Sequence, residues 1–220
     1  MITIFFIRHG QTLWNKEFKY QGHSDIELSE EGLQQANRVA LRLRREPFSA
    51  IYSSDLSRAV VTAEKVAQYH SLPVVPMSEF REVGFGDWEG LKYDQIYAGW
   101  SAEIEKFFRF PSQVEIPGGE SFHGVQKRTN EGLEILRQRH DGECIAVVTH
   151  GGAIRTMLCS ALGIPLDSLW SFRQDNTAVN IVEYEERKNI LRLVNDVNHL
   201  YDFESLDPDR LPSYNINKIF

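Results

Sequence analysis

Ile2-Thr3-Ile4-Phe5-Phe6-Ile7 opens this 220-residue chain and runs directly into Arg8-His9-Gly10. A second run of the same kind, residues 145–149, ends in His150-Gly151-Gly152. Continuous apolar runs of this length, rich in β-branched residues, predict strands that are buried on both faces, as in a parallel sheet covered by helices. Ligands bind outside the carboxyl ends of such strands. We therefore expect both histidines at one functional edge of a single sheet.

Helical and strand patterns alternate along the rest of the chain. Ser29 is an expected N-cap for the first long helix, and Ser54 or Asp55 for the second. The pattern predicts an α/β fold: a three-layer sandwich with a mostly parallel central sheet, helices on both faces and a helical lid insertion. We expect helices at 33–45, 56–69, 121–140 and 151–162, strands at 50–53 and 72–76, the latter at an edge because of its two prolines, and a closing hairpin of 178–184 with 190–194.

The length suits one well-buried core. We expect a single domain over residues 1–202, with the lid insertion at about 92–117 and a C-terminal tail at 203–220. The lid segment is helical but irregular and rich in aromatic residues. Since the segment is not rich in basic residues as a nucleic-acid platform would be, we interpret these rings as core and lid packing.

The composition limits the classes of partner. A net charge of −7 disfavours electrostatic capture of nucleic acid or of an anionic membrane. The N-terminal apolar run lacks a basic leader and is far shorter than a membrane span, so we expect a cytoplasmic protein. Cys144 and Cys159 fit free buried thiols better than a disulfide framework. The oligomeric state is not readable from the sequence.

Cationic side chains and one carboxyl group follow the predicted strands. Arg8 and His9 end the first strand, and Arg58 lies at the start of the helix after the second, where the helix N-terminus adds partial positive charge. Glu82 precedes a turn-rich loop, and His150 ends the later strand. Each of these alone would fit a structural or solvated role. Together they predict a pocket for an anion.

Five motifs in this order resemble the histidine phosphatase superfamily, the phosphoglycerate-mutase-like enzymes, from residue 2 to about residue 200. The motifs are Arg8-His9-Gly10-Gln11-Thr12 with Trp14-Asn15, Ser53-Ser54-Asp55-Leu56-Ser57-Arg58-Ala59, Arg81-Glu82 with Gly86-Asp87-Trp88-Glu89-Gly90, Pro117-Gly118-Gly119-Glu120-Ser121, and Thr149-His150-Gly151-Gly152. Any one of them would be a weak signal, whereas the ordered set is specific.

The resemblance implies roles for residues at matching positions. His9 is expected to be the phosphate-accepting nucleophile and Glu82 the proton donor to the leaving oxygen, with His150 as a further catalytic residue in the phosphate pocket. Expected substrate-binding residues are Arg8, Asn15, Gln21, Gly22, Arg58 and Gly151. His23 is a further candidate because it follows Gln21 and Gly22, whereas solvated roles suffice for Asp87 and Glu89. The mechanism needs no metal and no cofactor, since the arginines supply the positive charge.

The resemblance predicts a metal-independent phosphomonoesterase that acts on a small phosphorylated metabolite through a phosphohistidine. Within the family, the phosphoglycerate mutases carry a basic stretch after the Arg-Glu motif that residues 84–93 lack, which disfavours that alternative. The α-ribazole phosphatases and the broad-specificity phosphatases both fit the motifs, and the choice between them stays open. A binding module without catalysis is the alternative from another class. It would not need a nucleophile and a proton donor together.

Overall fold

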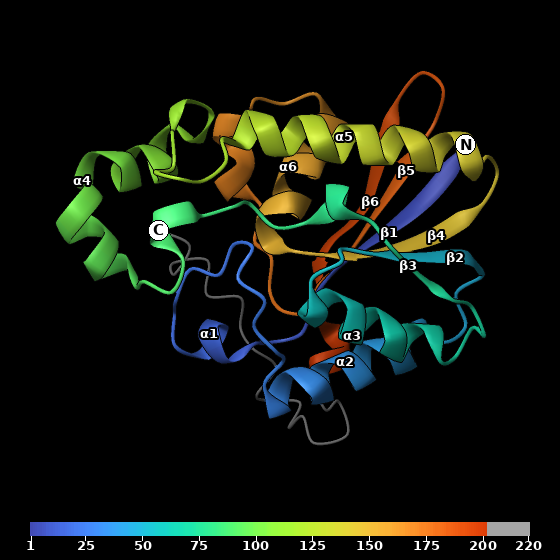
Figure 1. Cartoon of the computed structure of the whole chain (residues 1–220). Coiled ribbons are helices and arrows are strands. Elements are labelled where there is room, and N and C mark those ends of the chain that lie inside the picture. Colours follow the sequence, from blue (N-terminus) through green and yellow to red (C-terminus); the bar gives the residue numbers. More distant parts are fainter. Residues whose placement is uncertain (202–220) are drawn as a thin grey trace, which may run out of the picture.

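The computed structural model describes residues 1–201, so the tail expected at 203–220 lies outside the described part of the chain. Its centre is a six-stranded sheet with the order β3-β2-β4-β1-β5-β6 (Figure 1). The strands are β1 (Ile2–Arg8), β2 (Phe48–Ser53), β3 (Val74–Pro76), β4 (Cys144–Thr149), β5 (Val179–Tyr184) and β6 (Asn189–Asp196). β1 to β4 are parallel to one another, and β5 pairs antiparallel with β1 and with β6. The mostly parallel sheet, the edge strand with its prolines and the closing hairpin are confirmed.

Helices cover both faces of this sheet, as expected for three layers (Figure 1). The layers contain α2 (Glu30–Leu43) and α3 (Ser57–Ala67) on one side, and α5 (Phe122–Arg139) and α6 (Gly151–Leu162) on the other. Alternate residues of β1 serve the two layers: Ile4 and Phe6 pack in the cluster with α5 and α6, and Phe5 and Ile7 in the cluster with α2 and α3. Strands buried on both faces explain the continuous apolar runs in the sequence.

The register of β1 with β4 sets the place of both histidines. Arg8 is the partner of Thr149, and the His9 backbone N–H donates to the Thr149 carbonyl at 2.9 Å. Because the two strands run parallel, His9 and His150 leave the same edge next to each other. Their ring centroids are 5.0 Å apart. The expectation of one functional edge is confirmed.

The predicted N-cap is confirmed for α2 but not for α3. Ser29 caps α2 by accepting the Gly32 N–H, as expected, although the helix begins three residues before the predicted boundary. The predicted cap of α3 is wrong. Leu56 takes that position without a side-chain bond, and the Asp25 carboxylate accepts both the N–H and the hydroxyl of Ser57. A residue distant in sequence therefore replaces the local cap.

α4 (Tyr93–Arg109) projects beyond the sheet at the left of Figure 1, together with the loop that holds the short helix α1 (Leu13–Lys16). α4 is kinked at Trp100, whose backbone is not helical. Its apolar side packs in a third core cluster, where Phe107 is buried. The interpretation of the aromatic residues as packing holds only in part, because some are about half exposed: Tyr93 (44 %), Tyr97 (45 %), Phe108 (45 %) and Phe110 (50 %).

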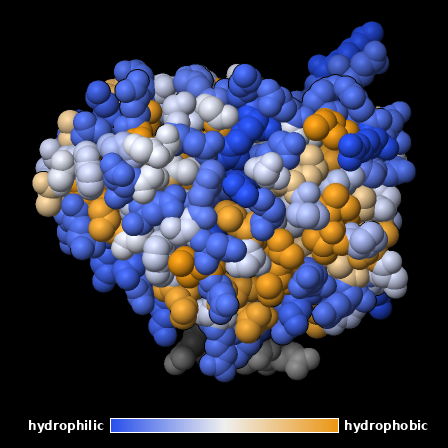
Figure 2. Space-filling model, viewed as in Figure 1, coloured by the Kyte–Doolittle hydropathy of each residue, from blue (hydrophilic) through white to orange (hydrophobic). Residues whose placement is uncertain are grey.

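The surface of this face is mostly hydrophilic, with apolar residues around α3 and the edge strand β3 (Figure 2). In the part of the chain that the structure describes, no helix is long and apolar enough to span a membrane.

Two leucines of α2 test the layer assignment. Leu43 is buried (1 % exposed) and Leu41 is half exposed (50 %). Leu43→Ala should lower the free energy of unfolding by about 2–5 kcal/mol, because it leaves a cavity in the packed layer. Leu41→Ala should change it by less than about 0.5 kcal/mol. Urea denaturation measures both, and equal losses would contradict the packing of α2 described above.

Candidate active site

His9 lies buried just beyond β1 with one ring nitrogen bound and the other available. Its Nδ1 is 2.7 Å from the Gly10 carbonyl oxygen. A carbonyl only accepts, so Nδ1 carries the hydrogen and, in the neutral ring, Nε2 keeps its lone pair. Burial, together with the charges of Arg58 and Arg8, holds the pKa of His9 well below its ordinary value of 6.5. His9 is thus a neutral imidazole near physiological pH.

His150 and Arg58 form a buried pair beside His9. The Arg58 Nε donates to the His150 Nδ1 at 3.3 Å, so the other nitrogen of His150 carries the hydrogen and donates to the Ser54 hydroxyl at 2.8 Å. The other two nitrogens of Arg58 donate to the carbonyls of Ser24 and Gly22. Burial lowers the pKa of Arg58 to about 10, which still leaves it charged at neutral pH. The guanidinium is therefore held from three sides.

Arg8 adds a second guanidinium from the end of β1. Its Nη1 donates to the Gln174 carbonyl at 2.6 Å, while its buried Nε has no partner among the described residues. Arg155, which the sequence reasoning missed, lies one helical turn after Gly151. Burial and the charge of Arg8 lower the pKa of Arg155 to about 10. A Cβ at Gly151 would lie 3.1 Å from Arg155 Nη1 and 3.4 Å from Arg8 Nε, so glycine leaves room for both guanidinium groups.

Glu82 brings the negative charge to the first turn of α6. Its carboxylate accepts the backbone N–H groups of Gly152 and Ala153, each at 3.1 Å, and that of Val83 at 3.0 Å. A Cβ at Gly152 would lie 2.5 Å from the Glu82 Oε1. The glycine at position 152 therefore leaves the space in which the Glu82 carboxylate approaches the backbone of α6. The sequence alone did not reveal this.

The other predicted site residues surround this centre. Asn15 belongs to the capping box of α1, and its Oδ1 accepts from Thr12 N–H and from the Asn176 side chain. Gln21 is buried and accepts the Thr12 hydroxyl at 2.8 Å. Gly22 has a φ of +55° and contributes the carbonyl that holds Arg58, while a Cβ there would meet the Glu89 carboxylate. The structure thus brings all nine predicted site residues to one edge of the sheet.

Glu89 joins two loops of the site, whereas the sequence predicted only a solvated role for it. Its carboxylate accepts from the backbone N–H groups of His23, Ser24 and Phe85 and from the Ser24 hydroxyl. These bonds join the loop that holds Arg58 to the loop that follows Glu82. No local pattern marks this contact, because the two loops are more than sixty residues apart in the sequence.

A second brace involves His23. Its Nε2 donates to the Glu82 carbonyl at 2.9 Å and lies 3.5 Å from the Glu120 carboxylate. Arg128 binds the same carboxylate and donates to the same carbonyl. Burial alone would raise the pKa of Glu120, but its bonds from His23 and Arg128 hold it far below the ordinary value. The segment 117–121, which contains Glu120, therefore helps to position the backbone of Glu82 through His23 and Arg128.

These groups open into one cavity of about 410 Å³. Its walls combine cationic, acidic and aromatic side chains. They are Arg8, His9, Asn15, Phe18, Lys19, Tyr20, Gln21, Gly22, Arg58, Glu82, Phe85, Tyr93 and Phe108. Such a cavity can hold an anion against two guanidinium groups, with a neutral imidazole and a carboxyl group in reach.

Comparison with known proteins agrees with this geometry. The family model described as "Histidine phosphatase superfamily (branch 1)" matches residues 4–197. Phosphoserine phosphatase 1 of Hydrogenobacter thermophilus is 34 % identical over 203 residues, which cover 92 % of this chain and 96 % of the relative. Phosphoglycerate mutase-like protein 4 of Arabidopsis thaliana is 38 % identical over 90 % of this chain and 86 % of its own. The solved structure of Bacillus stearothermophilus YhfR, 35 % identical, superposes with a TM-score of 0.87 over 91 % of this chain and 100 % of that one.

The chain belongs to the histidine phosphatase superfamily. The match covers nearly all of the described residues, and the order of motifs expected from the sequence lies within it.

The pKa values of the histidines in the site should be shifted in opposite directions. Burial, the neighbouring arginines and their mutual contact hold the pKa values of His9 and His150 well below 6.5, whereas the bond to Glu120 raises that of His23. Long-range ¹H–¹⁵N spectra should show His9 and His150 neutral at pH 6.5 and His23 already protonated in most molecules. Since the unfolded chain binds more protons at the first two, they lower the free energy of unfolding as the pH falls below 6.5.

His23 should have the opposite effect on stability, which makes it the internal control for this titration. Its bond to Glu120 stabilises the fold below pH 6.5, and this contribution disappears as the pH rises through its raised pKa. A protonated His9 at pH 6.5 would contradict the electrostatic description of the site.

Proposed function

We propose that this protein is a metal-independent phosphomonoesterase that hydrolyses a small phosphorylated metabolite through a phosphohistidine on His9. The proposal is carried by one observation: a neutral imidazole, with its Nε2 lone pair free, lines a cavity beside the buried guanidinium group of Arg58 and the partly buried one of Arg8. Catalysis of phosphoryl transfer consists mostly of positioning and charge stabilisation. The names of the phosphatase relatives support the same reaction class.

In the first step, Nε2 of His9 attacks phosphorus in line, and the bond between phosphorus and the leaving oxygen breaks. The negative charge of the bound phosphate favours the protonated form of the neighbouring Glu82. The electron pair goes to the leaving oxygen, which takes that proton from Glu82. Arg8 and Arg58 bind the phosphoryl oxygens, because both guanidinium groups line the cationic end of the cavity. His150 accepts a hydrogen bond from Arg58 and thereby orients that guanidinium group. Asn15 and the first N–H of α6, at Gly151, complete the pocket.

In the second step, a water molecule attacks the phosphohistidine. The bond between phosphorus and Nε2 breaks, the imidazole regains its lone pair, and Glu82 accepts the proton from the water. Gln21 and Gly22 act through their loop, since Gly22 fixes Arg58 by its carbonyl. We further propose the cytoplasm as the compartment of the protein. The free thiols of Cys144 and Cys159 support a reducing environment.

The mutase alternative is tested on the same protein. With 3-phosphoglycerate and 2,3-bisphosphoglycerate as primer, a mutase releases 2-phosphoglycerate, whereas a phosphatase releases inorganic phosphate. A binding module would do neither.

His9→Ala should abolish phosphate release, by roughly 10⁴-fold or more, because no other group replaces the nucleophile. Assays in EDTA should leave the wild-type activity unchanged. Rapid-quench trapping should label wild-type His9 with acid-labile phosphate. His123→Ala, an exposed histidine on α5, is the matched control and should keep full activity. Trapped phosphate on another residue, or a magnesium requirement, would contradict the mechanism.

Glu82→Gln should separate two kinds of substrate. Sugar phosphates, whose alkoxides need a proton, should lose about 10²–10⁴-fold in kcat, while p-nitrophenyl phosphate should lose much less because its phenolate leaves without one. The control is Glu79→Gln, a partly buried residue three positions earlier that does not line the cavity. Equal losses for both substrates would show that Glu82 is not the proton donor.

A further inference from the structure

The cavity of the candidate active site has two chemically different ends. The phosphate end contains His9, the two arginines and Glu82. Its remaining wall contains five aromatic side chains from three separate segments: Phe18, Tyr20, Phe85, Tyr93 and Phe108. A phosphoryl group needs none of these rings. They therefore face the part of a substrate that leaves.

Phe18 is the most exposed of the five rings, and packing within the protein does not account for its position. Its side chain is 83 % exposed, and its φ is +57°, in the left-handed region that bulky residues rarely adopt. The turn is fixed by bonds from the N–H groups of Phe18 and Lys19 to carbonyls of α1. An exposed ring and a strained backbone both cost free energy. Strain of this kind is frequent at ligand sites.

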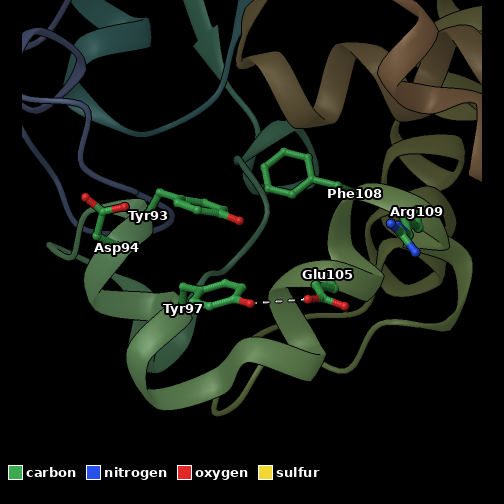
Figure 3. Close-up of a pocket in the computed structure, with 6 residues that line it drawn as sticks. All are labelled: Tyr93, Asp94, Tyr97, Glu105, Phe108 and Arg109. Carbon is green, nitrogen blue, oxygen red and sulfur yellow. Dashed lines mark hydrogen bonds between the residues drawn. The ribbon is translucent and has the colours of Figure 1, made fainter.

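Tyr93 and Phe108 face the cavity from the two arms of α4, on either side of the kink at Trp100. Their ring centroids are 6.1 Å apart, and each ring is almost half exposed. The same two residues border a second cavity of about 510 Å³ between the arms, where Tyr97 stacks on Tyr93 (Figure 3). The two rings thus stand as a wall with open space on both sides.

The positive charge at this end is already paired within the protein. Among the lining residues, Lys19 is the one cation outside the phosphate end. Its Nζ lies 2.7 Å from the Glu17 carboxylate and over the ring of Trp14. A carboxylate on the substrate, as in phosphoserine, would compete with Glu17 for this lysine. An aromatic ring would meet no such competition.

We propose that the preferred substrates are phosphomonoesters whose leaving group carries an aromatic ring, held between Phe18 and the Tyr93–Phe108 wall. This inference rests on the proposed phosphatase activity and specifies its substrate class. Offset or edge-to-face contacts with several rings would recognise the leaving group, and the cationic end would recognise the phosphate.

The test compares benzyl phosphate with phosphoserine. Both esters release an alkoxide, but the leaving group of the first carries an aromatic ring and that of the second carries an amino group and a carboxylate. The wild-type kcat/KM should be at least about 10-fold higher for benzyl phosphate. Phe18→Ala and Phe108→Ala should each lower that value about 3- to 10-fold and change phosphoserine hydrolysis less than about 2-fold. Phe108→Tyr, which keeps a ring, should retain most of the preference. Phe110→Ala is the matched control, since Phe110 is half exposed next to α4 but borders neither cavity.

A second measurement separates recognition from catalysis. Calorimetry should find benzylphosphonate, which cannot be hydrolysed, bound about 10-fold more tightly than methylphosphonate, with the difference reduced in Phe18→Ala. Hydrolysis of both esters without an aromatic preference, or equal losses for both in the variants, would overturn the substrate class and leave the phosphatase activity standing. Tighter binding of benzylphosphonate without hydrolysis of any ester would support the aromatic site and overturn the proposed activity.

Discussion

The parallel pairing of β1 with β4 is the constraint on which the site depends. It places Arg8 opposite Thr149, so the chain leaves both strands at the same height and His9 meets His150. α6 begins directly at this point, and its free N–H groups bind Glu82. One register thus brings together the proposed nucleophile His9, a helix N-terminus and a carboxyl group that lie far apart in sequence.

Concentrated positive charge is the consequence of that convergence. Arg8, Arg58 and Arg155 are all largely removed from water, where an uncompensated charge would be costly. Backbone carbonyls of neighbouring loops and the Glu82 carboxylate offset part of this cost. The remaining donors favour an anion. Burial, together with the same positive field, keeps His9 neutral. In the proposed reaction, the two arginines would therefore both bind the phosphate and help to keep the nucleophile unprotonated.

The loops around this centre form a single braced unit. Glu89 joins the loop that holds Arg58 to the loop after Glu82, and Glu120 with Arg128 fixes the backbone of Glu82 from α5. Within the described residues, the lid segment contributes less to this bracing and more to the aromatic rim. The cationic end of the cavity is thus defined by buried polar and ionic contacts, whereas its other end is defined by aromatic rings, of which Phe18, Tyr93 and Phe108 are open to solvent.

The sequence by itself determined the sheet, the layers and the residues at the strand ends, because buried parallel strands leave continuous apolar runs and ligands bind at their carboxyl ends. It could not determine the cap of α3 by Asp25, the bridge made by Glu89, the place of Arg155 beside Arg8 or the exposure of Phe108. Each of these depends on contacts between segments distant in the chain. Local patterns record which face of an element is buried, but only the tertiary structure decides which polar groups meet there.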